Sequence, residues 1–66
     1  MEVFINRVPV AADAGTSLAE LLERRNVAAE GIAVAVDNKV VPRAEWAGCR
    51  LHEGAKITVI RAVCGG

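Results

Sequence analysis

Residues 57–66 read ITVIRAVCGG, and this stretch organises the rest of the chain. The six residues from Ile57 to Ala62 are rich in β-branched side chains, a composition typical of a strand. Gly65 and Gly66 extend such a strand poorly, because glycine loses the most backbone entropy on ordering and offers no side chain to pack. We therefore expect a folded domain over residues 1–62 and a flexible C-terminal tail over 63–66, whose α-carboxylate is the first candidate for chemistry.

Length and composition define one small domain. The 66 residues are 53% hydrophobic, mostly aliphatic, and this content supplies a compact core. Eight basic and eight acidic side chains cancel. Nothing in this balance favours nucleic acid or a membrane surface as a partner. No apolar run reaches the length of a bilayer span and the first residues lack a basic leader region, so we expect a cytoplasmic protein.

Cysteine and histidine are too few for a metal centre. Cys49 and Cys64 have no metal-ligand spacing, and His52 cannot complete a four-ligand zinc site with them. We expect no metal, two free thiols in a reducing compartment, and a solvated rather than catalytic His52.

Two hairpins are predicted from turn chemistry. Residues 2–6 and 8–10 are strand-like runs separated by Asn6-Arg7, and residues 32–36 and 39–41 are separated by Asp37-Asn38. Asn and Asp tolerate the left-handed backbone that tight hairpin turns require. Pro9 lacks an N–H and so must lie on a sheet edge or at a bulge.

One amphipathic helix is expected between the hairpins. Ser17 and Glu20 have the spacing of a capping box, so Ser17 is the predicted N-cap. Leu18, Leu21 and Leu22 then share one face of a helix of about three turns. That helix ends near Asn26. Later in the chain, residues 42–46 suit a single helical turn in which Trp46 covers an edge of the core.

A combination of motifs resembles a known family. The diglycine follows the last strand, the block VPRAEW occupies residues 41–46, and Asp37-Asn38 ends an Ala-Val-Ala-Val strand. Together with the short length, these features resemble the ThiS group of sulfur carriers in thiamine biosynthesis, over essentially the whole chain. The diglycine alone is shared with molybdopterin-synthase small subunits and with ubiquitin. The VPRAEW block and the short length are therefore the features that distinguish the ThiS group from these proteins. The resemblance implies the α+β ubiquitin-like β-grasp fold, a mixed sheet of four to five strands packed on one amphipathic helix, with the first and last strands side by side.

The resemblance also implies a function, that of a protein co-substrate rather than an enzyme. In that family an E1-like adenylyltransferase (ThiF type) uses ATP to adenylate the C-terminal carboxylate, and the carrier itself binds no cofactor. A sulfur donor, commonly a cysteine desulfurase, then produces a thiocarboxylate, and thiazole synthase (ThiG type) takes the sulfur. Transferred to this sequence, the reacting group is the carboxylate of Gly66, and Gly65, Cys64 and Val63 contact the partners. Glycines without a Cβ suit passage through a narrow channel.

The sequence is also compatible with other functions. The same fold carries sulfur for molybdopterin or tRNA thiolation, or becomes a protein modifier joined through Gly66 to lysines. A plain interaction domain with an accidental diglycine is a further alternative. Cys64 is either a small tolerated residue or, since it lies two residues from the carboxylate, a relay for sulfur.

The sheet face opposite the helix is a candidate docking surface. Strand alternation places Phe4 and Ile60 there, together with Ala33, Ala35 and Thr58. In a domain with one helix this face has no cover, so its apolar residues suggest a surface for partner proteins, with Phe4 and Ile60 as contacts. The alternative is that they are the scattered apolar residues found on every protein surface.

Overall fold

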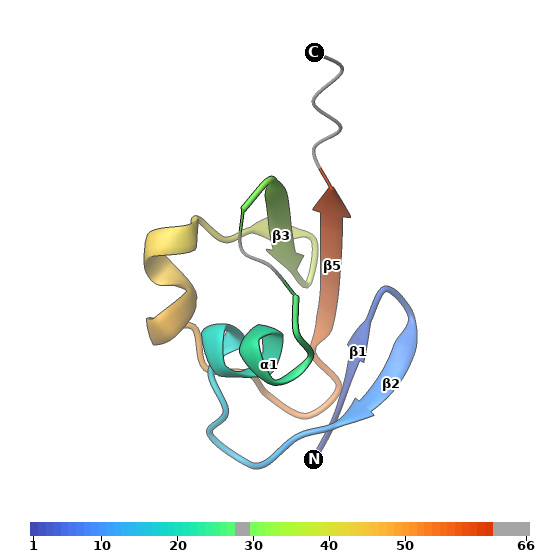
Figure 1. Ribbon diagram of the computed structural model, residues 1–66. Coiled ribbons are helices and arrows are strands. Elements are labelled where there is room, and N and C mark those ends of the chain that lie inside the picture. The colour runs from blue at the N-terminus through green and yellow to red at the C-terminus, as the bar shows by residue number, and fades with distance from the viewer. Residues whose placement is uncertain (28–29, 62–66) are drawn as a thin grey trace.

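The structure, a computed structural model, describes residues 1–27 and 30–61 (Figure 1). The expected boundary between a domain and a tail at residue 62 lies outside this range. The elements, in chain order, are β1 (Glu2–Ile5), β2 (Val8–Ala11), α1 (Leu18–Arg24), β3 (Ile32–Val36), β4 (Lys39–Val40), the 3₁₀ helix η1 (Arg43–Gly48) and β5 (Lys56–Arg61). Helix α1 packs across one face of the sheet.

The five strands form one mixed sheet in the order β2-β1-β5-β3-β4. Strands β1 and β5 are parallel neighbours, and the other pairs are antiparallel. The first and last strands therefore lie side by side, as the family resemblance implied and as periodicity alone could not establish. Pro9 lies in edge strand β2, where its missing N–H costs no ladder bond, so that prediction is confirmed.

Both predicted hairpin turns are present. The φ angles are 49° at Asn6, 71° at Arg7, 51° at Asp37 and 68° at Asn38. Positive φ at both central residues defines the type I′ turn, whose twist matches that of the flanking strands. The second hairpin is shorter than predicted, because β4 ends at Val40 and Val41 adds only its N–H···O=C bond to Val34.

Helix α1 begins at the predicted cap. The Glu20 N–H donates to Ser17 Oγ at 3.2 Å, and the Ser17 hydroxyl donates to the Glu20 carboxylate at 3.1 Å. The helix has 7 residues, two turns rather than the three expected, because the backbone turns left-handed at Asn26, where φ is 56°. Leu18, Leu21 and Leu22 are buried, as their spacing predicts.

Replacing Ser17 by Ala removes the cap of this short helix. We expect the free energy of unfolding to fall by about 1 kcal/mol, since the Glu20 N–H loses its acceptor. Glu20→Ala keeps that bond and loses the exposed carboxylate together with the hydrogen bond that it accepts from the Ser17 hydroxyl, so it is the matched comparison and should cost less. Urea unfolding of both variants measures the difference; equal costs would contradict the assigned cap.

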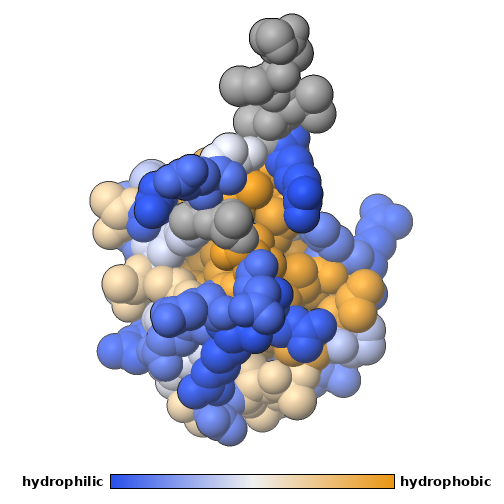
Figure 2. Space-filling view, viewed as in Figure 1, coloured by the Kyte–Doolittle hydropathy of each residue, from blue (hydrophilic) through white to orange (hydrophobic). Residues whose placement is uncertain are grey.

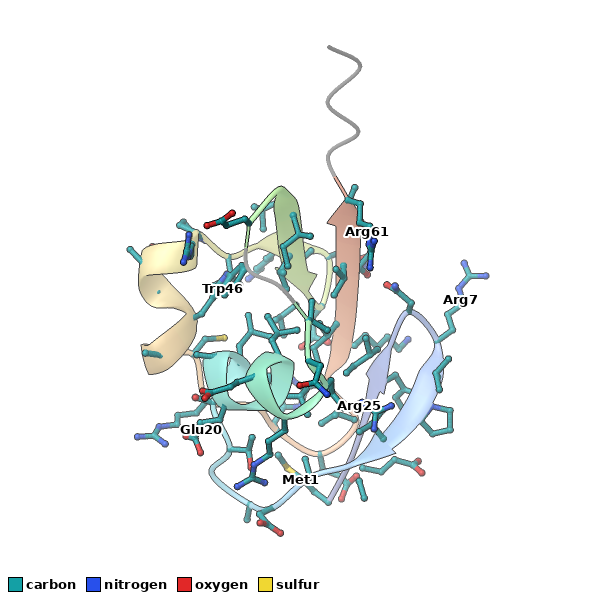
Figure 3. All side chains as sticks on the ribbon, in the orientation of Figure 1. Met1, Arg7, Glu20, Arg25, Trp46 and Arg61 are labelled. Atoms are coloured by element: carbon teal, nitrogen blue, oxygen red, sulfur yellow. The ribbon has the colours of Figure 1, made fainter. Side chains whose placement is uncertain are left out.

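The core lies between α1, η1 and the sheet. Trp46 projects from η1 over this core, is 6% exposed, and donates its Nε1–H to the Val41 carbonyl at 2.8 Å (Figure 3). Pro42 caps η1, so the predicted helical turn with Trp46 over the core edge is confirmed, although η1 is longer than one turn. The buried cluster comprises Val3, Val10, Leu18, Leu21, Leu22, Val34, Trp46, Leu51, Ala55 and Ile57.

Because α1 is short, it does not cover the whole of its side of the sheet. Figure 2, seen from the α1 side, shows apolar side chains between the charged surface of α1 and the β1–β2 hairpin. Val8 is 55% exposed, and Ile5 and Val59 are half-buried against the core. The sheet therefore presents apolar surface on both faces.

Candidate functional site

Strand β5 is the platform from which the predicted reactive end of the chain continues. It lies between β1 and β3, and its pairing with β3 extends to the Ile32–Arg61 pair. On the other side Asn6 extends the pairing beyond β1, because its side-chain Oδ1 accepts the Val59 N–H at 2.9 Å. The strand is thus held from both sides almost to its last residue.

Four of the predicted site residues lie outside the described residues. They are Val63, Cys64, Gly65 and Gly66. The two that are described, Phe4 and Ile60, lie on the predicted face, since Phe4 pairs with Lys56 and Ile60 with Ala33. They are four β5 positions apart, roughly 13 Å, and so do not form one contact patch. Phe4 is half-buried, whereas Ile60 is 54% exposed.

The outer face, defined here as the sheet face opposite α1, differs in two places from the prediction. Ala35 is only 8% exposed, because its small side chain lies between Val40 and Thr58 on the neighbouring strands. It therefore offers little contact area. Val40 is 71% exposed and pairs with Ala35. The sequence pattern predicts only a short returning strand at this position and does not indicate an exposed apolar side chain. The exposed apolar side chains of the outer face thus include Ile60, near the end of β5, and Val40, which is level with Thr58 across β3.

A groove of about 670 Å³ crosses the start of β5. It lies between the two hairpin turns, since Asn6 and Arg7 flank it on one side and Asn38 on the other. The lining is completed by Phe4, Lys56 and Thr58, whose side chains lie on the outer face. Ile57 also lines the groove. Sequence reasoning missed the groove because it is formed by two turns 30 residues apart in the chain. A smaller hollow of about 350 Å³ lies between α1 and η1, beside Leu22 and Trp46.

The Asp37 carboxylate ties the second turn to the loop before β5. Its Oδ1 accepts the Lys56 N–H at 3.1 Å, and its Oδ2 lies 2.7 Å from His52 Nε2. His52 Nδ1 lies 3.0 Å from the Glu53 carbonyl oxygen, so both ring nitrogens face acceptors and the protonated imidazolium satisfies both. The hydrogen bond to Asp37, and then that to Glu53, raises the pKa of His52 above its ordinary value of 6.5. The hydrogen bonds from His52 and Lys56 lower the pKa of Asp37. His52 is exposed, as predicted, but it has a structural partner that the sequence did not reveal.

This pair predicts a specific pH dependence of stability. Because the folded-state pKa of His52 is raised, its contribution is present below pH 6.5 and is lost as the pH rises through the folded-state pKa. Because the pKa of Asp37 is lowered from 3.8, its contribution is present above that pH and is lost on further acidification. We expect the difference in Tm between wild type and His52→Ala to be small. It should be greatest between pH 3.8 and pH 6.5 and should vanish in mild alkali. Thermal melts from pH 4 to pH 9 measure it; a difference that grows above pH 7 would contradict the assignment.

Among residues 1–27 and 30–61, no group of three or more His, Cys, Asp or Glu side chains is placed to hold a metal ion. Cys49 is a free, half-buried thiol. Arg43 is exposed at the start of η1, and Arg61 is exposed at the end of β5 (Figure 3). None of the described helices has both the length and the hydropathy needed to cross a membrane.

A mixed β2-β1-β5-β3-β4 sheet packed on one helix, with parallel first and last strands, is the architecture of a ubiquitin-like β-grasp protein. The comparisons with known proteins agree and are more specific. The chain matches the model of the ThiS family over residues 3–66 and belongs to that family. It is 30% identical to the sulfur carrier protein ThiS of Escherichia coli (strain K12) over 66 residues, which is 100% of each chain. The crystal structure of the thiamine biosynthesis protein ThiS from Geobacter metallireducens superposes with a TM-score of 0.86 at 25% identity, covering 100% of both chains. The family is one of sulfur carriers, so the chain is a carrier and not an enzyme.

Proposed function

We propose that this chain carries sulfur for thiazole formation in thiamine biosynthesis, with the α-carboxylate of Gly66 as the attachment point. The observation that carries the proposal is the family match, which continues to residue 66 and so includes the diglycine. The structure supports it in one respect: β5 is held by β1 and β3, so the residues after Arg61 start from a fixed platform. The titratable pair Asp37–His52 lies at the opposite end of β5 and has a structural role.

The chemistry follows from the weakness of a carboxylate as an acyl donor. An oxygen of the Gly66 carboxylate attacks the α-phosphorus of ATP on an E1-like adenylyltransferase (ThiF type), and pyrophosphate leaves. The acyl-adenylate has AMP as a leaving group: the outer sulfur of a cysteine desulfurase persulfide attacks the acyl carbon, and AMP is expelled. A thiol then reduces the resulting acyl disulfide, which releases the thiocarboxylate and leaves the two thiol sulfurs joined as a disulfide. Thiazole synthase (ThiG type) takes this sulfur and returns the carboxylate. The carrier holds no cofactor in this cycle, and a cytoplasmic location, where ATP is available, remains a prediction.

Reconstitution tests the proposal. The chain is incubated with the ThiF-type enzyme, ATP, a cysteine desulfurase, cysteine and a thiol reductant, and its intact mass is measured. We expect the mass to rise by the difference between sulfur and oxygen, and to return to the starting value when thiazole synthase and its substrates are added. Higher-mass conjugates to lysine would instead indicate a modifier. If thiazole synthase does not remove the sulfur from the loaded chain but molybdopterin synthase does, the chain carries sulfur for molybdopterin.

The outer face near the end of β5 is the proposed docking surface for the activating enzyme and the synthase. Ile60→Asp places a charge at its centre, where burial against a partner would desolvate the carboxylate. We expect the KM for the carrier in the adenylation reaction to rise about tenfold, without a change in fold. Val8→Asp is the matched control, because Val8 is 55% exposed against 54% for Ile60 but belongs to the other side of the sheet. An equal rise in KM for Ile60→Asp and Val8→Asp would contradict the proposal that the partners dock on the outer face.

A further inference from the structure

The groove at the start of β5 gathers positive charge in a chain whose net charge is zero. Its two charged lining residues, Arg7 and Lys56, are both cations. Among the described residues, the ion pairs are Arg24–Asp13 and His52–Asp37, so neither lining cation has a carboxylate partner there. The nearest acidic turn residue, Asp37, already directs its two oxygens to the Lys56 N–H and to His52. Figure 3 shows Arg7 extending away from the first turn into solvent.

Neutral hydrogen-bond donors add to these cations. The Oδ1 of Asn6 is occupied by the Val59 N–H, so its amide nitrogen is the group left for a ligand. Asn38 and Thr58 line the groove as well, and Phe4 contributes an apolar surface. The groove is therefore complementary to a carboxylate next to an apolar side chain.

On the basis of the sulfur-carrier function proposed above, we propose that this groove receives an acidic segment of the activating enzyme, a loop in which Asp or Glu flanks an apolar residue. A protein fits better than a small anion, because the charges are carried by long exposed side chains rather than by buried donors. The groove also continues, through Thr58, into the outer face around Ile60 and Val40 that the partner is proposed to cover.

The position of the groove limits its role. Lys56 lies five β5 positions from Arg61, roughly 16 Å. The Lys56 end of the groove is thus far from the last described residue of β5, whereas Asn6 at its other end reaches the Val59 N–H. In this proposal the groove orients the carrier on the enzyme. Charges at such a distance act on the association step and on its salt dependence.

Neutralising the groove tests this assignment. In R7Q/K56Q we expect the KM of the ThiF-type enzyme for the carrier to rise roughly tenfold at low salt, with kcat unchanged. The difference in KM between R7Q/K56Q and wild type should decrease as NaCl is added, because salt screens exposed charges. The control R24Q/R25Q removes the same charge from exposed positions at the end of α1 and should leave KM within a factor of two of wild type. R7K/K56R keeps both charges and should restore most of the affinity.

Each other outcome overturns the proposal. An equal rise in KM for R7Q/K56Q and R24Q/R25Q would show that the effect depends on net charge and not on the groove. A rise in KM that salt does not change would show that the effect is not electrostatic. If only discharge by thiazole synthase is impaired, the occupant is the synthase. If inorganic pyrophosphate shifts the amide NMR signals of Lys56 and Thr58 at millimolar concentration, the groove is a small-anion site. A wild-type chain that the enzyme does not adenylate at all would overturn the proposed function, and this assignment with it.

Discussion

Deletion of Gly66 should abolish sulfur loading while leaving the fold intact. The deletion moves the carboxylate back by one residue, which spans at most about 3.6 Å, and a misplacement of only 1 Å can lower a rate about a hundredfold. We therefore expect thiocarboxylate formation to fall by at least about a hundredfold. The paired strands of the described residues end at Arg61, so Tm should match that of wild type. Intact mass and thermal melts of the same preparations measure both quantities.

Cys64→Ala is the control for this deletion. It changes a neighbouring residue but keeps the diglycine and its carboxylate in place, so loading should proceed at the wild-type rate if Cys64 is only a small tolerated residue. A large loss with Cys64→Ala would instead support the sulfur relay. Normal loading of the Gly66 deletion would contradict the assignment of the reactive group.

The largest effect on stability is expected at Trp46. This side chain covers the core from η1, and truncation to Ala leaves a cavity as well as an unpaired Val41 carbonyl. Such substitutions cost about 3–5 kcal/mol. A domain of this size has a total free energy of unfolding of roughly 3–10 kcal/mol, so Trp46→Ala should be largely unfolded near physiological temperature.

Trp46→Phe separates the two contributions. It keeps most of the apolar volume and loses the Nε1–H···O=C bond, which should cost about 1 kcal/mol. Circular dichroism with urea titration gives both values. A folded Trp46→Ala with nearly wild-type stability would show that η1 is not part of the core.

The sequence was most informative where local chemistry fixes the backbone. Asn6-Arg7 and Asp37-Asn38 were assigned as tight turns from their residue types, and both have the positive φ angles of such turns. Ser17 was assigned as the cap from its spacing to Glu20, and the hydrogen bonds are present. In each case the residues that decide the geometry are close together in the chain.

Features that depend on distant residues were predicted poorly or only by resemblance. The parallel pairing of β1 with β5 joins the two ends of the domain, and no periodicity specifies it. The burial of Ala35 depends on its neighbours on β4 and β5, and the contact between Asp37 and His52 spans 15 residues. The groove likewise needs both turns beside the start of β5.

If sulfur is carried on the carboxylate of Gly66, the sulfur atom of the loaded protein can be located directly. Trypsin cleavage after Arg61 of the loaded protein releases residues 62–66, AVCGG, which contain both candidate positions. Tandem mass spectrometry of this peptide should show one oxygen replaced by sulfur on the C-terminal glycine, with an unmodified Cys64 thiol. A peptide in which the added sulfur is bound to Cys64 as a persulfide, with Gly66 unchanged, would contradict the account.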